Sequence, residues 1–158
     1  MNDHSPLRDA RFADADVGPL RLRAEDAEDL QVLSALLQDA VATVGEASFL
    51  KGHCRFAALV NRFRWEGPTR TPERVRSVLV FENARAVRAQ GIDPRDRDMV
   101  ISILSLSWEP GEDGTGRVLV TLAGDGVIAV ECEALEVILQ DVTRPYVAPS
   151  GQAPHHPE

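Results

Sequence analysis

The chain has 158 residues, 44% of them apolar and 27% charged, and its formal net charge is −8. This size and composition predict a single globular domain, and no stretch approaches the roughly 20 apolar residues that a membrane-spanning helix needs. The acidic balance argues against non-specific binding of nucleic acid over the whole surface, so we expect neither a membrane nor nucleic acid as a partner.

The two ends of the chain are polar and have little to bury. Residues 1–18 mix both charges without periodicity, and residues 147–158 contain three prolines. We therefore expect a flexible lead-in and a disordered tail around one domain at residues 19–146. The first residues also lack the charged-then-apolar pattern of a secretion signal, which favours a cytoplasmic location.

One strand and one helix are predicted at the start of the domain. Polar and apolar residues alternate from Leu20 to Arg23, as in a strand with one buried face. Acidic residues then gather where a helix dipole favours negative charge, with Asp26 in the N-cap position. Apolar residues follow at spacings of three and four, which predicts an amphipathic helix packed on a sheet: Leu30, Leu33, Leu37 and Val41.

After the helix, the residue pattern predicts strands only. The longest segment alternates between a face with Phe56 and Val60 and a face with Phe63 and Trp65. Asn83 interrupts the pattern, so the segment that follows it is expected to be an edge strand. The predicted strands are Ala47–Leu50, Arg55–Trp65, Arg74–Glu82, Ala84–Ala89 and Val100–Trp108.

The region from Arg117 to Val142 gives the clearest prediction of fold class. Two runs rich in valine, isoleucine and leucine flank Gly124-Asp125-Gly126, which indicates a β-hairpin. Together with the preceding strands, it predicts an α+β domain that is mostly antiparallel β. We expect a bent sheet, a small sandwich or a barrel-like arrangement, with one N-terminal helix packed on it.

Three glutamates near the end of this region form the strongest acidic group. On a straight strand, Glu131 and Glu133 point to the same face about 7 Å apart, a separation at which paired carboxylates can hydrolyse glycosides. A sugar cleft also needs aromatic side chains, and only 5% of the residues are aromatic. We therefore interpret Glu131, Glu133 and Glu136 as an acidic, solvated face without a catalytic role.

The two cysteines predict neither a disulfide nor a metal site. Cys54 and Cys132 each lie in or beside an apolar run, which favours two packed free thiols in a reducing compartment. His53 and Cys54 form one close-spaced pair of potential ligands, and Cys132 adds a lone thiol. A zinc site usually has two close-spaced pairs. No cofactor and no metal are expected.

The segment from Asn61 to Trp65, with the arginines after it, has the character of a binding site. Alternation places Arg62 and Arg64 on one face of a strand, away from Phe63 and Trp65. Guanidinium groups arranged in this way can bind phosphate, single-stranded RNA or an acidic partner, although stacking on RNA bases favours aromatic rings on the same face. The candidate binding residues are Arg62, Arg64, Trp65, Arg70, Arg74 and Arg76.

Several passages are typical of one protein family: Leu37–Ala40, Leu59–Glu66, Val87–Pro94 and Glu131–Glu133 leading into Leu139–Asp141. On these passages, the stretch from Leu20 to Tyr146 resembles a bacterial family of uncharacterised proteins, domain of unknown function 2948. The family has no established activity, so the resemblance implies a single bacterial domain and transfers no catalytic residue.

Three functional hypotheses remain open at this point. The leading one is a non-enzymatic cytoplasmic domain that acts through protein contacts, using either the arginines, which suit an acidic partner, or the acidic hairpin. The two oppositely charged regions could also pair one copy of the chain with another as a homodimer. The alternative is a module that uses the same arginines to bind RNA or a small anion. The third is an enzyme with an unrecognised site, in which Glu131 and Glu133 supply the carboxylates.

Overall fold

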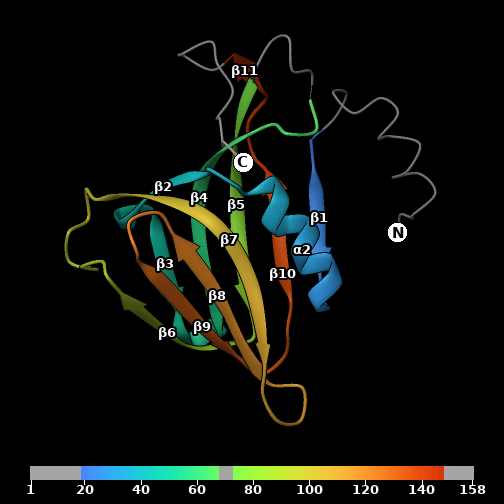
Figure 1. Cartoon of the computed structure of the whole chain (residues 1–158), viewed down its shortest axis with the longest axis vertical. Helices are drawn as coiled ribbons and strands as arrows, with labels where there is room; N and C mark the ends of the chain where they lie inside the picture. The colour runs from blue at the N-terminus through green and yellow to red at the C-terminus, as the bar shows by residue number, and fades with distance from the viewer. Residues whose placement is uncertain (1–18, 68–72, 148–158) are drawn as a thin grey trace.

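In the computed structural model, which describes residues 19–67 and 73–147, one continuous antiparallel sheet is strongly curled, and one helix lies at its open side, against β1 and β7 (Figure 1). The predicted α+β class, with a bent sheet and a helix packed on it, is confirmed. The expected lead-in at 1–18 lies outside the described residues, as does the expected tail except for Val147, which forms part of a strand. No helix in the described ranges is long and apolar enough to cross a membrane.

The described residues form eleven strands, more than the sequence pattern predicts. Along the sheet the order is β1-β10-β5-β4-β2-β7-β8-β9-β6, with β11 paired to β5 and β3 paired to β4. The helix α2 spans Ala27–Leu36, and two short helical turns are η1 (Val44–Glu46) and η2 (Lys51–His53). The strands are β1 (Arg21–Ala24), β2 (Val41–Thr43), β3 (Ala47–Leu50), β4 (Arg55–Phe63), β5 (Glu73–Glu82), β6 (Ala84–Gln90), β7 (Val100–Pro110), β8 (Gly116–Leu122), β9 (Val127–Cys132), β10 (Val137–Asp141) and β11 (Tyr146–Val147).

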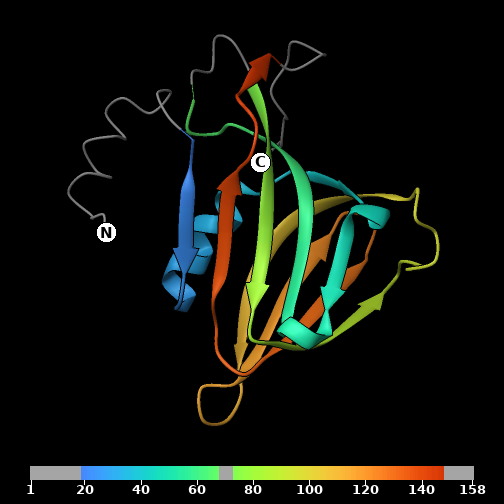
Figure 2. The ribbon, with the colours of Figure 1, turned by 180° about the vertical axis from the view of Figure 1, so that it is seen from behind.

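The curled sheet makes two facing walls with the core between them. The back wall consists of β1, β10, β5, β4 and β3, the front wall consists of β7, β8, β9 and β6, and β2 links β4 to β7 (Figures 1 and 2). The helix α2 lies beside β7 and packs against β1, on the inner side of the back wall. The outer side of the back wall is crossed by no described helix or strand (Figure 2).

The helix begins as predicted and ends earlier than predicted. The Asp26 carboxylate caps it by accepting a hydrogen bond from the Asp29 amide at 2.8 Å. The chain leaves the helix after Leu36 and Asp39 has a positive φ of 67°, so the apolar spacing does not continue helically to Val41. Val41 instead starts β2.

The glycine-rich turn is a hairpin turn, as predicted, but the region around it is not one unit. The Leu122 amide donates to the Gly126 carbonyl at 2.9 Å, and Gly124 and Asp125 supply the positive φ values that the turn requires. Beyond β9 the chain crosses to the back wall, where β10 inserts between β1 and β5. The acidic residues of this region are therefore divided between the two walls.

Both cysteines are free, as predicted, but only one of them is packed. Cys132 is buried, and burial raises the pKa of its thiol to about 11. Cys54 is exposed in a left-handed backbone conformation directly after η2.

Candidate functional site

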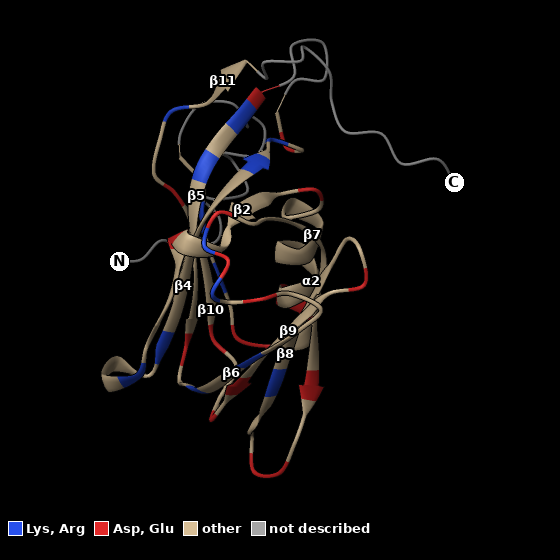
Figure 3. Ribbon diagram, turned by 90° about the vertical axis from the view of Figure 1, so that its left-hand side faces the viewer, with Lys and Arg blue, Asp and Glu red and all other residues tan. Residues whose placement is uncertain are grey.

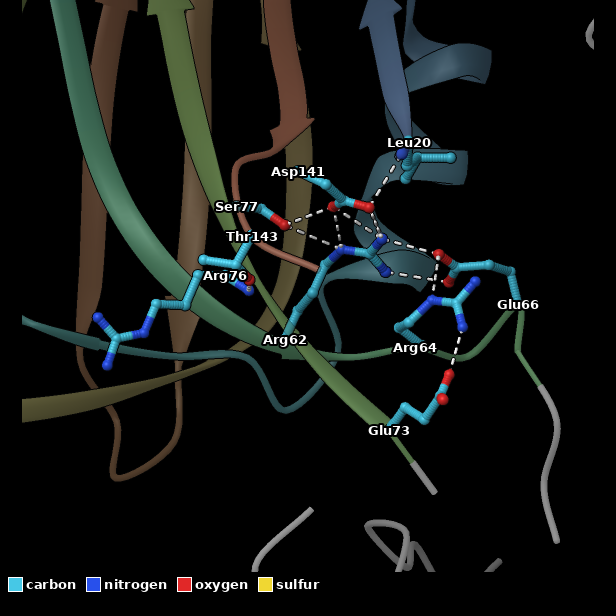
Figure 4. A network of polar contacts seen from close by, with 9 residues as sticks. All are labelled: Leu20, Arg62, Arg64, Glu66, Glu73, Arg76, Ser77, Asp141 and Thr143. Atoms are coloured by element: carbon cyan, nitrogen blue, oxygen red, sulfur yellow. Dashed lines mark hydrogen bonds and ion pairs between the residues drawn. The ribbon is translucent and has the colours of Figure 1, made fainter. Parts of the chain in front are cut away.

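Arg62, the central residue of the predicted arginine segment, lies inside the protein. It faces the core from β4 and its side chain is 0% exposed. Its guanidinium donates through both terminal nitrogens to Glu66, at 3.0 and 2.7 Å, and to Asp141 at 3.0 Å (Figure 4). Its Nε also donates to the Ser77 hydroxyl at 3.2 Å. The guanidinium is thus closed off from solvent and already bonded to protein groups through all three of its nitrogens.

Asp141 connects Arg62 to three other strands. Its carboxylate accepts hydrogen bonds from the Ser77 hydroxyl at 2.7 Å and from the Leu20 amide at 2.9 Å. These partners belong to β5 and to the residue before β1, while Asp141 itself ends β10. The carboxylate therefore ties four neighbouring strands together at one end of the back wall.

Arg64 is also buried, which corrects the prediction of a solvent-facing arginine strip. It is 2% exposed, forms an ion pair with Glu73, and places its Nε 3.8 Å from the Glu66 carboxylate. We call Arg62, Arg64, Glu66, Glu73, Ser77 and Asp141 the buried ionic cluster. Its two arginines face three carboxylates, so no positive charge is left over to bind an anion.

The charges in the buried ionic cluster are strongly held. Burial alone would raise the pKa of Glu66, but the hydrogen bond and charge of Arg62 outweigh it and lower that pKa below the ordinary value. Burial alone would likewise lower the pKa of Arg62, and its two carboxylate partners raise it instead. Both groups stay ionised near neutral pH, which suits a structural role and gives no proton donor or acceptor.

The other predicted binding residues divide into three cases. Trp65 packs against Phe63 with ring centroids 4.6 Å apart, and its indole NH donates to the Gln38 carbonyl at 3.0 Å. Trp65 lies in the turn after β4, which ends at Phe63, so the predicted continuation of the strand to Trp65 is wrong. Arg70 lies outside the described residues. Arg74 and Arg76 point away from the core, and Figure 4 shows the Arg76 side chain directed away from Arg62.

Arg74 and Arg76 belong to the uncovered outer side of the back wall, which we call the outer face. The strand register places its side chains in rows across β1, β10, β5 and β4. One row joins Arg23, Ile138, Val80 and Ala57, the next joins Arg21, Gln140, Val78 and Leu59, and Arg76 lies opposite Asn61. The outer face therefore has an apolar centre made of Ala57, Leu59, Val78, Val80 and Ile138, of which Ile138 is buried and the other four are half-buried.

The rim of the outer face is positively charged. Two of its arginines are ion-paired, Arg55 with Glu82 at 3.0 Å and Arg23 with Glu136 at 3.4 Å. The other three, Arg21, Arg74 and Arg76, have no carboxylate partner among the described residues: Arg21 donates to Gln140 and Arg74 to Asn61. Figure 3 shows the basic stretch on the upper part of β5 and acidic residues at the far end of the β7–β8 hairpin.

The three predicted glutamates do not form one acidic face. Glu131 is on β9 in the front wall and pairs with Arg88 at 2.8 Å, whereas Glu136 precedes β10 and pairs with Arg23. Glu133 lies beyond the end of β9, so the straight-strand geometry assumed for the pair does not apply. The Arg88 hydrogen bond lowers the pKa of Glu131, which is the opposite of what a general acid requires.

The apolar centre of the outer face is not among the features predicted from the sequence, although the residue pattern indicates it. Strand β5 carries Leu79 and Phe81 toward the core and also Val78 and Val80 toward the outside. An antiparallel strand with one solvated face normally has polar residues there. Tyr146 was also missed, because its place beside Arg74 on the outer face depends on the pairing of β11 with β5.

Comparison with protein families gives one match. The model of a family described as "Protein of unknown function (DUF2948)" matches residues 20–156. No curated protein and no solved structure matches the chain. Within the described residues, no group of three or more histidine, cysteine, aspartate or glutamate side chains is arranged to hold a metal ion.

Proposed function

The chain belongs to the DUF2948 family of proteins of unknown function, and we propose that it is a non-enzymatic cytoplasmic domain that binds a protein partner through its outer face. The observation that carries the proposal is the apolar centre of an uncovered sheet face with arginines around it. Two unpaired cysteines are consistent with the cytoplasm, where thiols stay reduced.

The apolar centre favours a protein over a small polar ligand. Val78 and Val80 project from the middle of the face and are flanked by Leu59 and Ala57 on β4. Burying such side chains against a partner releases about 25 cal/mol for each Å² of apolar surface removed from water. An uncovered apolar group of this kind, rimmed by polar residues, is the usual anatomy of a protein interface.

The rim specifies the charge of the partner. Arg21, Arg74 and Arg76 offer guanidinium groups that no carboxylate of the described residues neutralises. Arginine binds carboxylates in a bidentate geometry and is enriched in protein interfaces. The partner we propose therefore presents aliphatic side chains between aspartate or glutamate residues.

Site-specific photocrosslinking tests this proposal. A photoreactive phenylalanine analogue at Val78 reports contacts of the apolar centre in cells that express the full chain. The same analogue at Val32, a 51% exposed residue of α2 on the other side of the back wall, is the matched control. We expect a discrete protein adduct from position 78, absent from position 32, that disappears in the Arg74→Glu/Arg76→Glu double variant.

Two results would overturn the proposal. Equal adducts from positions 78 and 32 would mean that the outer face has no preference, and the absence of any protein adduct from position 78 would mean that it is unoccupied. Retention of the adduct in the double variant would remove the arginines from the interaction.

A second candidate function rests on Tyr146. This residue is 36% exposed beside Arg74, and the Asn61 side-chain amide donates to its hydroxyl. An aromatic ring on the same face as arginines is an arrangement that binds single-stranded nucleic acid, with the ring stacking on a base. Copurified RNA that crosslinks to Tyr146 and is lost in high salt would favour this function over protein binding.

A further inference from the structure

A second surface, separate from the outer face, is bounded by two strand edges. Strands β3 and β6 form its two sides, and each pairs on one edge only, β3 with β4 and β6 with β9. At one end the Ala84 amide donates to the Cys54 carbonyl at 2.9 Å. At the other end the Gly45 amide donates to the Arg97 carbonyl at 2.8 Å. We call the closed ring made of residues 45–54 and 84–97 the frame.

The frame is built to stay in place. A Cβ atom at Gly45 would lie 2.9 Å from the Arg97 carbonyl oxygen, so glycine permits the close approach that closes this end. The Arg97 guanidinium also donates back to the Gly45 carbonyl at 2.9 Å. Phe49 on β3 and Val87 on β6 pack against the core toward the Cys54 end.

An apolar pocket lies behind the frame. It is lined by residues of both walls, and every lining residue except Thr43 is apolar. Small side chains create the space, because Ala47 and Ala58 are directly opposite each other on β3 and β4. Ile128 on β9 also lines the pocket, and the residue paired with it on β6 is the exposed Ala89.

The size of the pocket selects the kind of ligand. It leaves about 30 Å³ of free space. This is room for the end of one aliphatic side chain, whereas sites for drug-sized molecules have about 300–1,000 Å³. An apolar space of this size does not hold water well, because Thr43 is the only lining residue with a polar side chain and a buried water needs two to four polar partners.

We propose that the frame binds an extended segment of a partner polypeptide that inserts one valine, isoleucine or leucine side chain into the pocket. Two kinds of contact combine in this mode. The free edges of β3 and β6 offer unpaired backbone amides and carbonyls that a strand can pair with, and the pocket accepts one side chain of the added strand. The main-chain contacts provide affinity for any extended chain, and the pocket selects the aliphatic residue.

Blocked heptapeptides of the form acetyl-Thr-Ser-Thr-X-Thr-Ser-Thr-amide, with X varied, test the proposal on the full chain. In ¹H–¹⁵N spectra we expect the peptide with leucine, isoleucine or valine at X to shift the amide signals of residues 47–50 and 84–90. Leucine should bind at least about tenfold more tightly than alanine at X, since its side chain removes more apolar surface from water. Aspartate at X should not bind.

A matched pair of variants separates the pocket from the rest of the surface. Ala47→Phe fills the mouth of the pocket and should abolish the preference for leucine, while Ala35→Phe, on the exposed side of α2, should leave it intact. If Ala47→Phe does not fold, Ala89→Trp at the exposed rim replaces it.

Three outcomes would overturn the proposal. One is equal binding of the leucine and aspartate peptides, and another is a set of shifts confined to the outer face. The third is a response of the pocket signals to benzene but to none of the peptides, which would assign the pocket to small apolar molecules. Each of these leaves the proposed function of the outer face untouched, because that function concerns a different side of the sheet.

Discussion

Arg62 on β4 and Arg76 on β5 are close in the sheet but differ in role, one inside the protein and the other on its surface. The register pairs Arg76 with Asn61 and Arg62 with Val75, so the two arginines are one position apart and project from opposite sides of the back wall. Arg62 is fully buried among carboxylates, whereas Arg76 is exposed and has no carboxylate partner in the described part of the chain. The pleat of the strand decides which arginine stabilises the fold and which one is available to a partner.

The comparison also shows why the inner side tolerates charge. A buried charge costs several kcal/mol unless it is paired and hydrogen-bonded, and Arg62 reaches Glu66, Asp141 and Ser77 together. Around Arg76 the residues that the structure describes offer no comparable set of acceptors, and its side chain stays exposed to water. The same end of the back wall thus has the buried ionic cluster on its inner side and a candidate interface on its outer side.

The largest effect is predicted for a variant that disrupts the buried ionic cluster on the inner side. Asp141→Ala removes the partner of Arg62, Ser77 and the Leu20 amide and leaves a buried guanidinium undercompensated. We expect the free energy of unfolding to fall by about 3–5 kcal/mol, as measured by urea denaturation. Glu133→Ala, at an exposed position, is the control and should change it by less than about 0.5 kcal/mol. A loss of similar size in both variants would contradict the structural role of Asp141.

Glu66→Gln is expected to have the next largest effect, and the effect should depend on pH. Arg62 lowers the pKa of Glu66 in the folded state, so its contribution is present above the ordinary glutamate range near pH ~4.3 and is lost as the pH falls through the lowered value. At pH 7 we expect the variant to lose about 1–3 kcal/mol. Urea denaturation between pH 7 and pH 3 should show this gap narrowing with acid. A gap that is constant with pH would exclude the charge interaction.

A smaller effect is expected for Ser77→Ala. The buried hydroxyl donates to Asp141 and accepts from Arg62, and the variant retains the ion pair itself. The free energy of unfolding should fall by about 1 kcal/mol, the usual net value of one hydrogen bond. It should fall further if nothing replaces the hydroxyl as a partner of Arg62 and Asp141. Ser48→Ala on β3, an exposed serine, provides the comparison and should be neutral by the same denaturation assay. An equal effect at both serines would place Ser77 outside the buried ionic cluster.

The smallest effect is expected on the outer face. Val80→Thr keeps the β-branched shape of the side chain and replaces a methyl group that projects away from the core. We expect unfolding to change by less than about 0.5 kcal/mol, while the crosslinking adduct from position 78 weakens because the apolar centre is interrupted. A large loss of stability without any change in the adduct would make the outer face part of the fold and not an interface.

The fold could be predicted from the sequence where the signals are local. The Asp26 cap, the Gly124–Gly126 turn, the interruption at Asn83 and the alternation of Phe56 and Val60 each depend on a few neighbouring residues, and the structure has them where the pattern places them. The end of the helix was misplaced because Asp39 adopts a left-handed conformation that the apolar spacing does not report.

The candidate site could not be predicted in the same way because its contacts join distant parts of the chain. Alternation separates Arg62 from Phe63, but only the fold shows that Asp141, 79 positions later, lies on the same side. Likewise, Glu131 and Glu136 are close in sequence and belong to different walls. The apolar residues Val78 and Val80 were visible in the sequence, and what was missing was the knowledge that nothing described covers them.

The most direct test of the division between inner and outer arginines is a single pair of unfolding measurements. Urea denaturation of Arg62→Ala and Arg76→Ala compares two arginines that differ by one position and one face of the sheet. We predict a loss of about 3–5 kcal/mol for Arg62→Ala, since two buried carboxylates lose their cation, and of less than about 0.5 kcal/mol for Arg76→Ala. Equal losses in the two variants would contradict the account.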